Sequence, residues 1–364
     1  MQELDRRSRD QGVQRHRQAG EIDDALLPER PSLSPGPLDP FRHGATDSGP
    51  DPVADFSTNV HPLGPCPAVL ERLAQAPRDR YPDPDYLRVR RDLADFHGVD
   101  PERIVPGSGA SELIHRLVGL HPGIVLTMQR TFVEYRRSAS IWNRDTLQAR
   151  SEAEFLRWLP LSAIAFLCHP NNPDGILHAP AFLEEAARTA EASGTILVLD
   201  LAYQSILDDH APQLPSRATH LYAPNKPLDC AGVRAAYLVA PTKEQGTAWR
   251  SHAPSWVVGS EGVALLEAWC SPEVASWLSG KRHQVRRLVT CLGSLLADAG
   301  WSVQATSANF LLARPPRAES ALALERSGLR LRDATNMGYP GWYRLAARPI
   351  RELVSLRDAL RTEV

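Results

Sequence analysis

The chain has 364 residues, a formal net charge of −2 and 43% hydrophobic residues. A charge so near zero gives no reason to expect nucleic acid or an anionic membrane as a partner. The length and apolar content are ample for a large core and suggest one larger and one smaller domain. No apolar run reaches the length of a membrane-spanning helix.

The first 40 residues are charged at their start and rich in proline and serine between 26 and 40. This composition is typical of a segment that cannot build a packed core, so we predict a mobile arm over 1–40. The arm has no apolar stretch of the kind found in secretory signals. The five cysteines show no metal-site spacing, so we expect reduced thiols, a cytoplasmic protein and no bound metal; they are Cys66, Cys168, Cys230, Cys270 and Cys291.

The middle of the chain alternates strand-like and helix-like segments. Short apolar runs at 124–128, 164–167 and 196–199 are typical of buried parallel strands. Between the last two runs lies an amphipathic helical pattern that ends near Gly194. This alternation predicts an α/β fold with a mostly parallel central sheet and helices on both faces.

The pattern changes after about residue 241. Long helices are predicted around 261–269 and 284–299, strands at 309–313 and 342–346, and a last helix near 350–362. This order predicts a smaller α+β domain at the C-terminus.

The first segment with a chemical signature is Gly107-Ser108-Gly109-Ala110-Ser111-Glu112, with Leu113, Ile114 and Leu117 following at helical spacing. Small residues at the start of a helix let backbone N–H groups close on a phosphate. An ordinary strand-to-helix loop is the alternative interpretation.

A second segment runs from an apolar strand at 166–168 into His169-Pro170-Asn171-Asn172-Pro173-Asp174-Gly175. An amide at this turn, that of Asn172, can hydrogen-bond a ligand hydroxyl or phenolate. Alone, the tetrapeptide 172–175 is more simply a turn, because its residues suit turn positions.

A third segment, Leu197-Val198-Leu199-Asp200, delivers an aspartate at the carboxyl end of a strand, where open α/β sheets bind ligands. Such a carboxylate can hold a pyridine nitrogen protonated, which makes the ring an electron sink. Asp200 could instead cap the next segment.

The fourth segment contains Lys226, then Gly232 six residues later and Arg234 eight residues later. A lysine in this context suits a Schiff base with an aldehyde cofactor, and the arginine suits that cofactor's phosphate. A solvated surface lysine is the simpler alternative for this motif alone. The four segments occur together in a consistent order, and together they indicate a site for pyridoxal phosphate (PLP).

These segments resemble the G-x-G-[AS]-x-E, N-P-x-G, D-x-A-Y and K-x5-G-x-R patterns of fold-type I, class I/II aminotransferases. More narrowly, the chain is similar to the histidinol-phosphate aminotransferase and threonine-phosphate decarboxylase branch, in a match that runs from about Phe41 to the C-terminus. Three further segments carry that likeness: Asp55–Pro65, Arg80–Pro84 and Thr131–Tyr135. The resemblance implies an N-terminal segment at 41–78 that packs on the small domain, a large PLP-binding domain at 79–240 and a small domain at 241–364.

The resemblance also implies roles around the cofactor. Lys226 and Asp200 would be catalytic, and Asn172 and Tyr203 would hydrogen-bond the ring oxygen. Other residues would hold the ring face or the phosphate: Phe132 or Tyr135 by stacking, and Gly109, Ala110, Ser111 and Arg234 at the phosphate. Tyr81 would reach over from a partner subunit, so the resemblance implies a homodimer.

On the substrate side, Arg344 resembles the family's carboxylate-binding arginine. Arg332 matches the place of a second anion-binding arginine, and His43 resembles a histidine that helps to hold a substrate phosphate. Asn59, in the Asp55–Pro65 match, is a further substrate-side candidate. Arg332 as surface charge and His43 as a linker histidine are the simpler alternatives.

Several positions depart from the family pattern, three of them in the motifs next to the predicted cofactor site. Ala223 stands where a serine is usual, Asn225 where a serine or threonine directly precedes the lysine, and Arg130 where a proline is usual. None of them removes a group that PLP chemistry requires.

The sequence therefore predicts a PLP-dependent aminotransferase that acts on a small anionic, optionally phosphorylated, amino acid or amine. A threonine-phosphate decarboxylase-like lyase on the same scaffold is the alternative, and a non-catalytic PLP-binding protein is a third hypothesis. A Rossmann or P-loop nucleotide site is excluded, because Gly107-Ser108-Gly109 lacks the third glycine and no G-x4-G-K-[ST] motif occurs.

Overall fold

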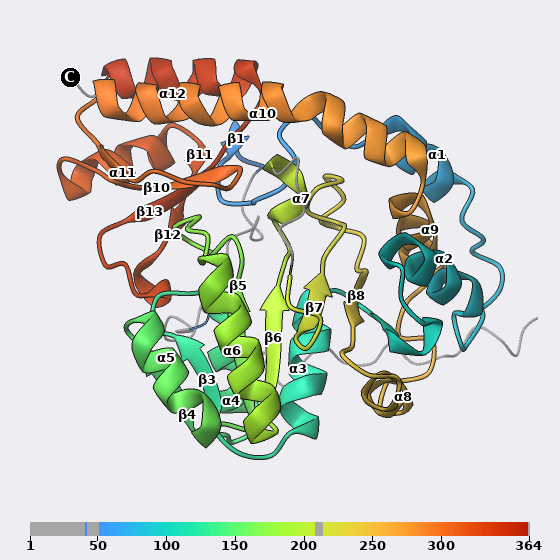
Figure 1. The fold of residues 1–364 in the computed structure, drawn as a ribbon. Helices are drawn as coiled ribbons and strands as arrows, with labels where there is room; N and C mark the ends of the chain where they lie inside the picture. The colour runs from blue at the N-terminus through green and yellow to red at the C-terminus, as the bar shows by residue number, and fades with distance from the viewer. Residues whose placement is uncertain (1–40, 42–50, 208–213, 363–364) are drawn as a thin grey trace, which may run out of the picture. The chain divides into compact units, whose positions relative to one another are not determined.

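A sheet of seven strands organises residues 104–239 (Figure 1). The computed structural model describes residue 41, residues 51–207 and residues 214–362. The strand order is β2-β8-β7-β6-β5-β3-β4, with bounds β2 Ile104–Gly107, β3 Val125–Met128, β4 Thr146–Ala149, β5 Ile164–Cys168, β6 Ile196–Asp200, β7 Thr219–Tyr222 and β8 Ala236–Val239. β8 is antiparallel to both neighbours and the other four pairs are parallel. The predicted α/β fold with a mostly parallel sheet is confirmed.

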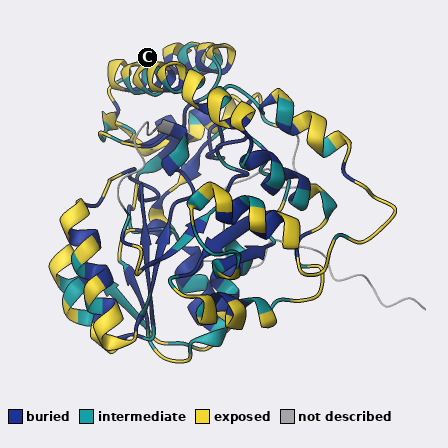
Figure 2. Cartoon of the chain, turned by 45° about the vertical axis from the view of Figure 1, so that its right-hand side comes forward, coloured by how far each residue is buried: buried dark blue, intermediate teal, exposed yellow. Residues whose placement is uncertain are grey.

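Helices cover both faces of this sheet, because successive strand residues point to opposite sides. Ile164 and Phe166 pack in one apolar cluster with helices α3 and α4, whereas Ala165 and Leu167 pack in another with α5 and α6. The helices of this part of the chain are α2 Leu87–His97, α3 Ala110–Leu120, α4 Glu134–Ile141, α5 Glu152–Trp158, α6 Pro180–Ser193, α7 Gln204–Leu207, α8 Lys243–Ser251 and α9 Ser260–Trp269, with 3-10 turns η3 Pro101–Arg103 and η4 Leu159–Leu161. Figure 2 shows the strands largely buried and the outward helix faces exposed.

A second, antiparallel sheet has the order β12-β13-β10-β9. Three helices pack on it through leucines such as Leu292, Leu324 and Leu356. Its elements are β9 Ser302–Val303, β10 Phe310–Arg314, β12 Arg332–Asp333, β13 Tyr343–Ala346, η5 Thr335–Met337, α10 Pro272–Asp298, α11 Ala318–Arg326 and α12 Ile350–Thr362.

The segment near the start of the described chain joins this C-terminal region. Strand β1 (Ala54–Asp55) pairs in parallel with β11 (Leu329–Arg330), and Phe56 is buried in the same apolar cluster as α10 and α12. Helix α1 (Pro67–Ala74) follows and contacts α9. Segments far apart in sequence are therefore brought together beside the second sheet.

Helix boundaries follow local signals. Pro180 opens α6 at a position where a missing N–H costs nothing, and Gly194 ends it in the left-handed conformation. Helix α10 begins much earlier than the predicted residue 284. Its true start is set by the Ser271 side chain, which accepts a hydrogen bond from the backbone N–H of Val274. Among the described helices, none is long and apolar enough to span a membrane.

Candidate active site

A cavity of about 340 Å³ opens where the carboxyl ends of β5 and β6 face the second sheet. Parallel strands deliver their terminal side chains to one edge, so this is the expected ligand-binding edge of the sheet. Eleven of the fifteen residues predicted for the site line this cavity: Asn59, Ala110, Ser111, Phe132, Asn172, Asp200, Tyr203, Lys226, Arg234, Arg332 and Arg344.

Asp200 ends β6 on the floor of the cavity and is 3% exposed. One carboxylate oxygen accepts a hydrogen bond from the backbone N–H of Ala202 at 3.1 Å, and the other accepts one from the Tyr135 hydroxyl at 2.7 Å. Burial raises the pKa of Asp200, while these two hydrogen bonds and the positive charge of Lys226 oppose the rise. The carboxylate is thus oriented by fixed donors beneath the cavity.

Tyr135, the second of the two candidates for stacking on a ligand ring, does not line the cavity. The side chain is fully buried and its ring stacks on Phe166, with centroids 4.7 Å apart and planes at 7°. Its hydroxyl is committed to Asp200. Of the two aromatic candidates, Phe132 alone is on the cavity wall, and Tyr135 instead positions the aspartate from below.

Lys226 is partly buried and lines the same cavity. Burial, followed by the positive charges of Arg344 and Arg234, lowers the pKa of Lys226 from 10.5 to about 8, and Asp200 opposes this shift. An amine with this pKa is neutral, and hence nucleophilic, far more often than an exposed lysine. Of the chain's three lysines, only Lys226 lies in the cavity; Lys243 pairs with Asp100.

The turn that carries Lys226 is held through its backbone. The carbonyl oxygen of Lys226 accepts hydrogen bonds from the N–H groups of His61, at 3.0 Å, and Asp229, at 3.3 Å. The N–H of Lys226 donates to the carbonyl of Ala223 at 3.0 Å. These contacts fix the start of a long side chain whose amine must reach one defined point.

One end of the cavity is built for an anion. Ala110 and Ser111 open helix α3, where free backbone N–H groups and the helix dipole favour negative charge. Gly109 has a φ of +90°, and an added Cβ would lie 2.6 Å from Nη2 of Arg234. Gly109 therefore lets the Arg234 guanidinium lie against the helix start, although Gly109 itself is not part of the cavity wall.

The opposite end contains two arginines on neighbouring strands. Arg332 of β12 and Arg344 of β13 are register partners and are 8% and 6% exposed. Like charges directly opposite each other destabilise a strand pair, so the arrangement favours an anion between or beside them. Burial lowers the pKa of Arg344 to about 10, which leaves it charged at neutral pH.

Arg344 is oriented by two hydrogen bonds, from Nη1 to Asn172 Oδ1 at 2.7 Å and from Nη2 to the carbonyl of Ser57 at 2.5 Å. Its Nε has no partner within the described chain, and neither do the two amide atoms of Asn59, which is 1% exposed. Buried polar atoms are normally satisfied. These orphaned donors and acceptors in the cavity wall are the kind that a polar ligand would satisfy.

Tyr203 also lines the cavity. Its ring meets the Phe310 ring edge-on, with the ring centroids 5.0 Å apart. Burial raises the pKa of its hydroxyl and the nearby Arg344 opposes that rise. Tyr203 is therefore a neutral hydrogen-bond donor at all ordinary pH values.

Two further predicted residues, besides Gly109 and Tyr135, are not among the residues that line the cavity. Tyr81 is 74% exposed and its ring stacks on that of Trp256, with the ring centroids 4.3 Å apart. It does not line the cavity of its own chain. His43 falls outside the described residues. The described residues hold no cluster of His, Cys, Asp and Glu that could bind a metal ion.

Sequence reasoning missed several wall residues: Ser57, Thr58, Val133, Cys168, Asn225 and Met337. Ser57 and Thr58 had a usable signal, because Asp55 accepts hydrogen bonds from both hydroxyl groups in a compact turn. Met337 had none. It reaches the cavity from a short 3-10 turn between β12, of two residues, and β13, of four. Elements this short show no hydrophobic periodicity in the sequence.

Comparison with known proteins gives consistent results. The sequence model of aminotransferase class I and II matches residues 51–360. A histidinol-phosphate aminotransferase of Paracoccus denitrificans is 28% identical over 82% of this chain and 86% of that protein. A threonine-phosphate decarboxylase of Salmonella typhimurium is 27% identical over 88% of this chain and 94% of that protein. The crystal structure of histidinol-phosphate aminotransferase from Sinorhizobium meliloti in complex with pyridoxal-5'-phosphate has a TM-score of 0.74 at 21% identity, covering 86% of this chain and 92% of that one.

Proposed function

Because the chain belongs to the aminotransferase class I and II family, whose members depend on PLP, we propose that it uses PLP to act on a small anionic amino acid or amine. The observation that carries this proposal is the placement of a partly buried amine, Lys226, and a buried carboxylate, Asp200, in one cavity wall. The preferred substrate carries two anionic groups, one of them a phosphate.

The cavity wall fits the cofactor at each of its polar groups. Ser111, the N–H groups that open α3 and the Arg234 guanidinium would hold its phosphate. Asp200 would face its pyridine nitrogen, and Phe132 would cover a ring face. Ala223 is on the same wall and brings no hydroxyl group. When bound, PLP supplies an aldehyde that condenses with amines and a ring that withdraws electrons from the adjacent carbon.

Each side chain of the cavity would then have its own role toward the cofactor. Lys226 would hold the cofactor through its amine, and its lowered pKa would let a free Nζ accept a proton. Asp200, oriented by Tyr135 and the N–H of Ala202, keeps negative charge beside the ring nitrogen. Asn172 and Tyr203 line the same cavity and would donate hydrogen bonds to the ring oxygen.

The two arginines would bind the substrate's anionic groups. Arg344, fixed by Asn172 and Ser57, grips a carboxylate. Arg332, its register partner, takes the second anion. Asn59 would add an amide from the cavity wall, and we retain His43 as a further phosphate contact.

A threonine-phosphate decarboxylase-like activity is the second candidate. It is supported by the similarity of nearly the whole chain to the Salmonella typhimurium decarboxylase. The two reactions differ in which bond to Cα is broken, hydrogen for transamination and carboxylate for decarboxylation. Both begin with the same bound amine and the same residues.

We also propose a cytoplasmic homodimer. The exposed Tyr81–Trp256 stack is an aromatic surface of the kind that interfaces bury, and a partner's copy of Tyr81 would complete the phosphate end of the cavity. The described structure contains five free cysteines and no disulfide, in keeping with a reducing compartment.

The experiment is a turnover screen of the PLP-loaded protein. Threonine phosphate, histidinol phosphate and their unphosphorylated counterparts are offered with 2-oxoglutarate, and CO2 release is followed beside keto-acid or aldehyde formation. The proposal predicts turnover of at least one phosphorylated amine and a selective loss of that turnover in Arg332→Ala. Turnover of unphosphorylated amines alone, with a silent Arg332→Ala, would remove the phosphorylated substrate from the proposal.

A further inference from the structure

The connection between β12 and β13, residues 334–342, carries a cavity arginine at each end. Arg332 precedes it and Arg344 follows it. Within it, Met337 lines the cavity, and Ala334 and Tyr339 are buried in the same small cluster as Val133. Any contact that fixes this β12–β13 connection therefore also fixes the relative placement of the two arginines.

Tyr339 connects the β12–β13 connection to the loop that follows β5. Its hydroxyl donates a hydrogen bond to Asp174 Oδ2 at 2.7 Å, and both residues are buried. The Arg130 guanidinium lies 4.9 Å from the centre of the Tyr339 ring. Gly338, with a φ of +88°, passes so close that an added Cβ would lie 3.0 Å from Cγ of Arg130. This packing gives a structural reason for an arginine at position 130.

Asp174 belongs to the loop that also orients Arg344. Its other oxygen accepts hydrogen bonds from Asn171 Nδ2, at 2.9 Å, and from the backbone N–H of Ile176, at 3.1 Å. Two residues earlier, Asn172 accepts from Arg344. The loop 171–176 is thus connected to Arg344 directly and to the β12–β13 connection through Tyr339.

Arg332 is reached through the same connection. Its Nη2 donates to Asn336 Oδ1 at 2.9 Å, and the carbonyl oxygen of Asn336 accepts from Arg136 Nη2 at 2.5 Å. Asn336 lies three residues from Tyr339, on the other side of Met337 and Gly338. Movement of the connection would therefore change the direction of the Arg332 guanidinium.

We propose that Asp174 and Tyr339 are positioning residues whose hydrogen bond sets the spacing of Arg332 and Arg344, and with it the enzyme's preference for substrates with two anionic groups. This inference rests on the proposed function, because it assigns the two arginines to substrate anions. A ligand with two anions must match the spacing of both guanidinium groups at once. A ligand with one anion needs only Arg344 and is insensitive to that spacing.

The test compares two ligands that lack an amine and so cannot react: 3-phosphonopropionate, with a carboxylate and a phosphonate, and propionate, with a carboxylate alone. Their Kd values are measured by calorimetry on wild type and Tyr339→Phe, which keeps the ring against Arg130 and removes only the hydroxyl. We expect the Kd of 3-phosphonopropionate to rise roughly tenfold, as for loss of one hydrogen bond to a charged group. The Kd of propionate should change less than about threefold.

Two further variants sharpen the test. Tyr343→Phe removes a hydroxyl four residues away, from a ring that packs on Trp301, and should leave the ratio of the two Kd values unchanged. Asp174→Ala should match Tyr339→Phe in direction, and the double variant should be no weaker than Asp174→Ala, because both changes remove one hydrogen bond.

Equal effects of Tyr339→Phe on both ligands, no effect on either, or a wild type that does not prefer the two-anion ligand would each overturn the inference. The titrations are made with and without PLP. Failure to bind PLP therefore contradicts the proposed function separately and leaves this comparison readable.

Discussion

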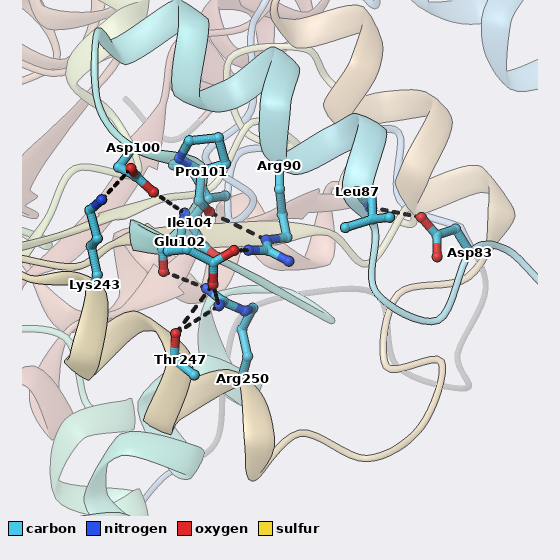
Figure 3. Close-up of polar contacts among 10 residues, drawn as sticks. All are labelled: Asp83, Leu87, Arg90, Asp100, Pro101, Glu102, Ile104, Lys243, Thr247 and Arg250. Carbon is cyan, nitrogen blue, oxygen red and sulfur yellow. Dashed lines mark hydrogen bonds and ion pairs between the residues drawn. The ribbon is translucent and has the colours of Figure 1, made fainter.

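Two clusters of charged residues in this chain are arranged in opposite ways. Around Glu102, at the far end of β2 from the cavity, each charge has a partner (Figure 3). Glu102 accepts from Arg90 at 2.6 Å and also pairs with Arg250, which in addition donates to the carbonyl of Ile104 at 3.0 Å. Nearby, Lys243 pairs with Asp100 at 2.7 Å.

Several polar groups of the cavity lack such partners. Lys226 makes no hydrogen bond or ion pair with any described side chain, and Arg344 stands opposite Arg332 rather than opposite a carboxylate. Asn59 and the Nε of Arg344 keep unused hydrogen-bonding atoms. Unpaired charges lower the stability of a fold, and proteins keep them where a ligand pairs with them. The contrast therefore identifies the cavity as the candidate functional site and the Glu102 cluster as a structural one.

The largest effect on activity should come from Asp200→Asn. The change removes the charge beside the ring nitrogen while keeping the shape and the N–H contact from Ala202, so PLP should remain bound and turnover should fall by several orders of magnitude. Steady-state kinetics on the PLP-loaded variant measures this. Tyr135→Phe is the graded comparison: it removes one of the two hydrogen bonds to the carboxylate and should cost roughly tenfold. Asp200→Asn activity within about threefold of wild type would contradict the role of Asp200.

Arg344→Ala should lower kcat/KM by roughly 30-fold to several thousand-fold, since loss of a desolvated bidentate charge pair costs about 2–5 kcal/mol. The matched control is Arg314→Ala on the neighbouring strand β10. Arg314 is exposed and lies outside the cavity, with its guanidinium carbon 5.4 Å from the centre of the Trp342 ring. Its removal should therefore leave kcat/KM unchanged. Similar losses in the two variants would mean that Arg344 acts only through fold stability.

The lowered pKa of Lys226 should also make the free energy of unfolding depend on pH. In the cofactor-free protein the pKa of Lys226 is about 8, against an ordinary 10.5. Between these values the unfolded chain binds more protons than the native state, so the free energy of unfolding rises with pH through that window. Relative to Lys226→Met, the wild type should gain up to about 3 kcal/mol from pH 8 to 10.5. Denaturant unfolding at several pH values tests this, and parallel profiles for the two proteins would rule it out.

The smallest effect is expected in the paired cluster. Glu102→Gln keeps the size of the side chain and weakens its pairing with Arg90 and Arg250. Because Glu102 is about half exposed, we expect a loss of about 1 kcal/mol in the free energy of unfolding and no change in kcat/KM. A change in kcat/KM beyond about twofold would show that this cluster is coupled to the cavity and is not purely structural.

Much of the fold could be predicted because its signals are local. The apolar runs at 164–167 and 196–199 became β5 and β6 to within one residue, and the predicted last helix has the observed bounds 350–362. The start of α10 was missed by about twelve residues. Its first turns are largely exposed and carry little periodicity, so only the cap at Ser271 marks the start.

The site was predictable where a motif places a residue at the end of a buried strand or at the start of a helix, as with Asp200 and Ser111. The sequence left either Phe132 or Tyr135 as the stacking ring, because the two lie three residues apart in the same motif and spacing alone does not say which ring faces the cavity. The Asp174–Tyr339 contact joins residues 165 positions apart. No local pattern reports such a pair.

The central claim, that Lys226 is the amine that holds the cofactor, has a direct chemical test. PLP-loaded protein is reduced with borohydride, which fixes an amine-bound cofactor through a stable C–N bond, and is then digested and analysed by mass spectrometry. With only three lysines in the chain, every one can be followed, and Lys243 and Lys281 serve as internal controls. We predict a pyridoxyl phosphate label on the Lys226 peptide alone. A label that is absent, or that is spread over Lys243 and Lys281, would contradict the account.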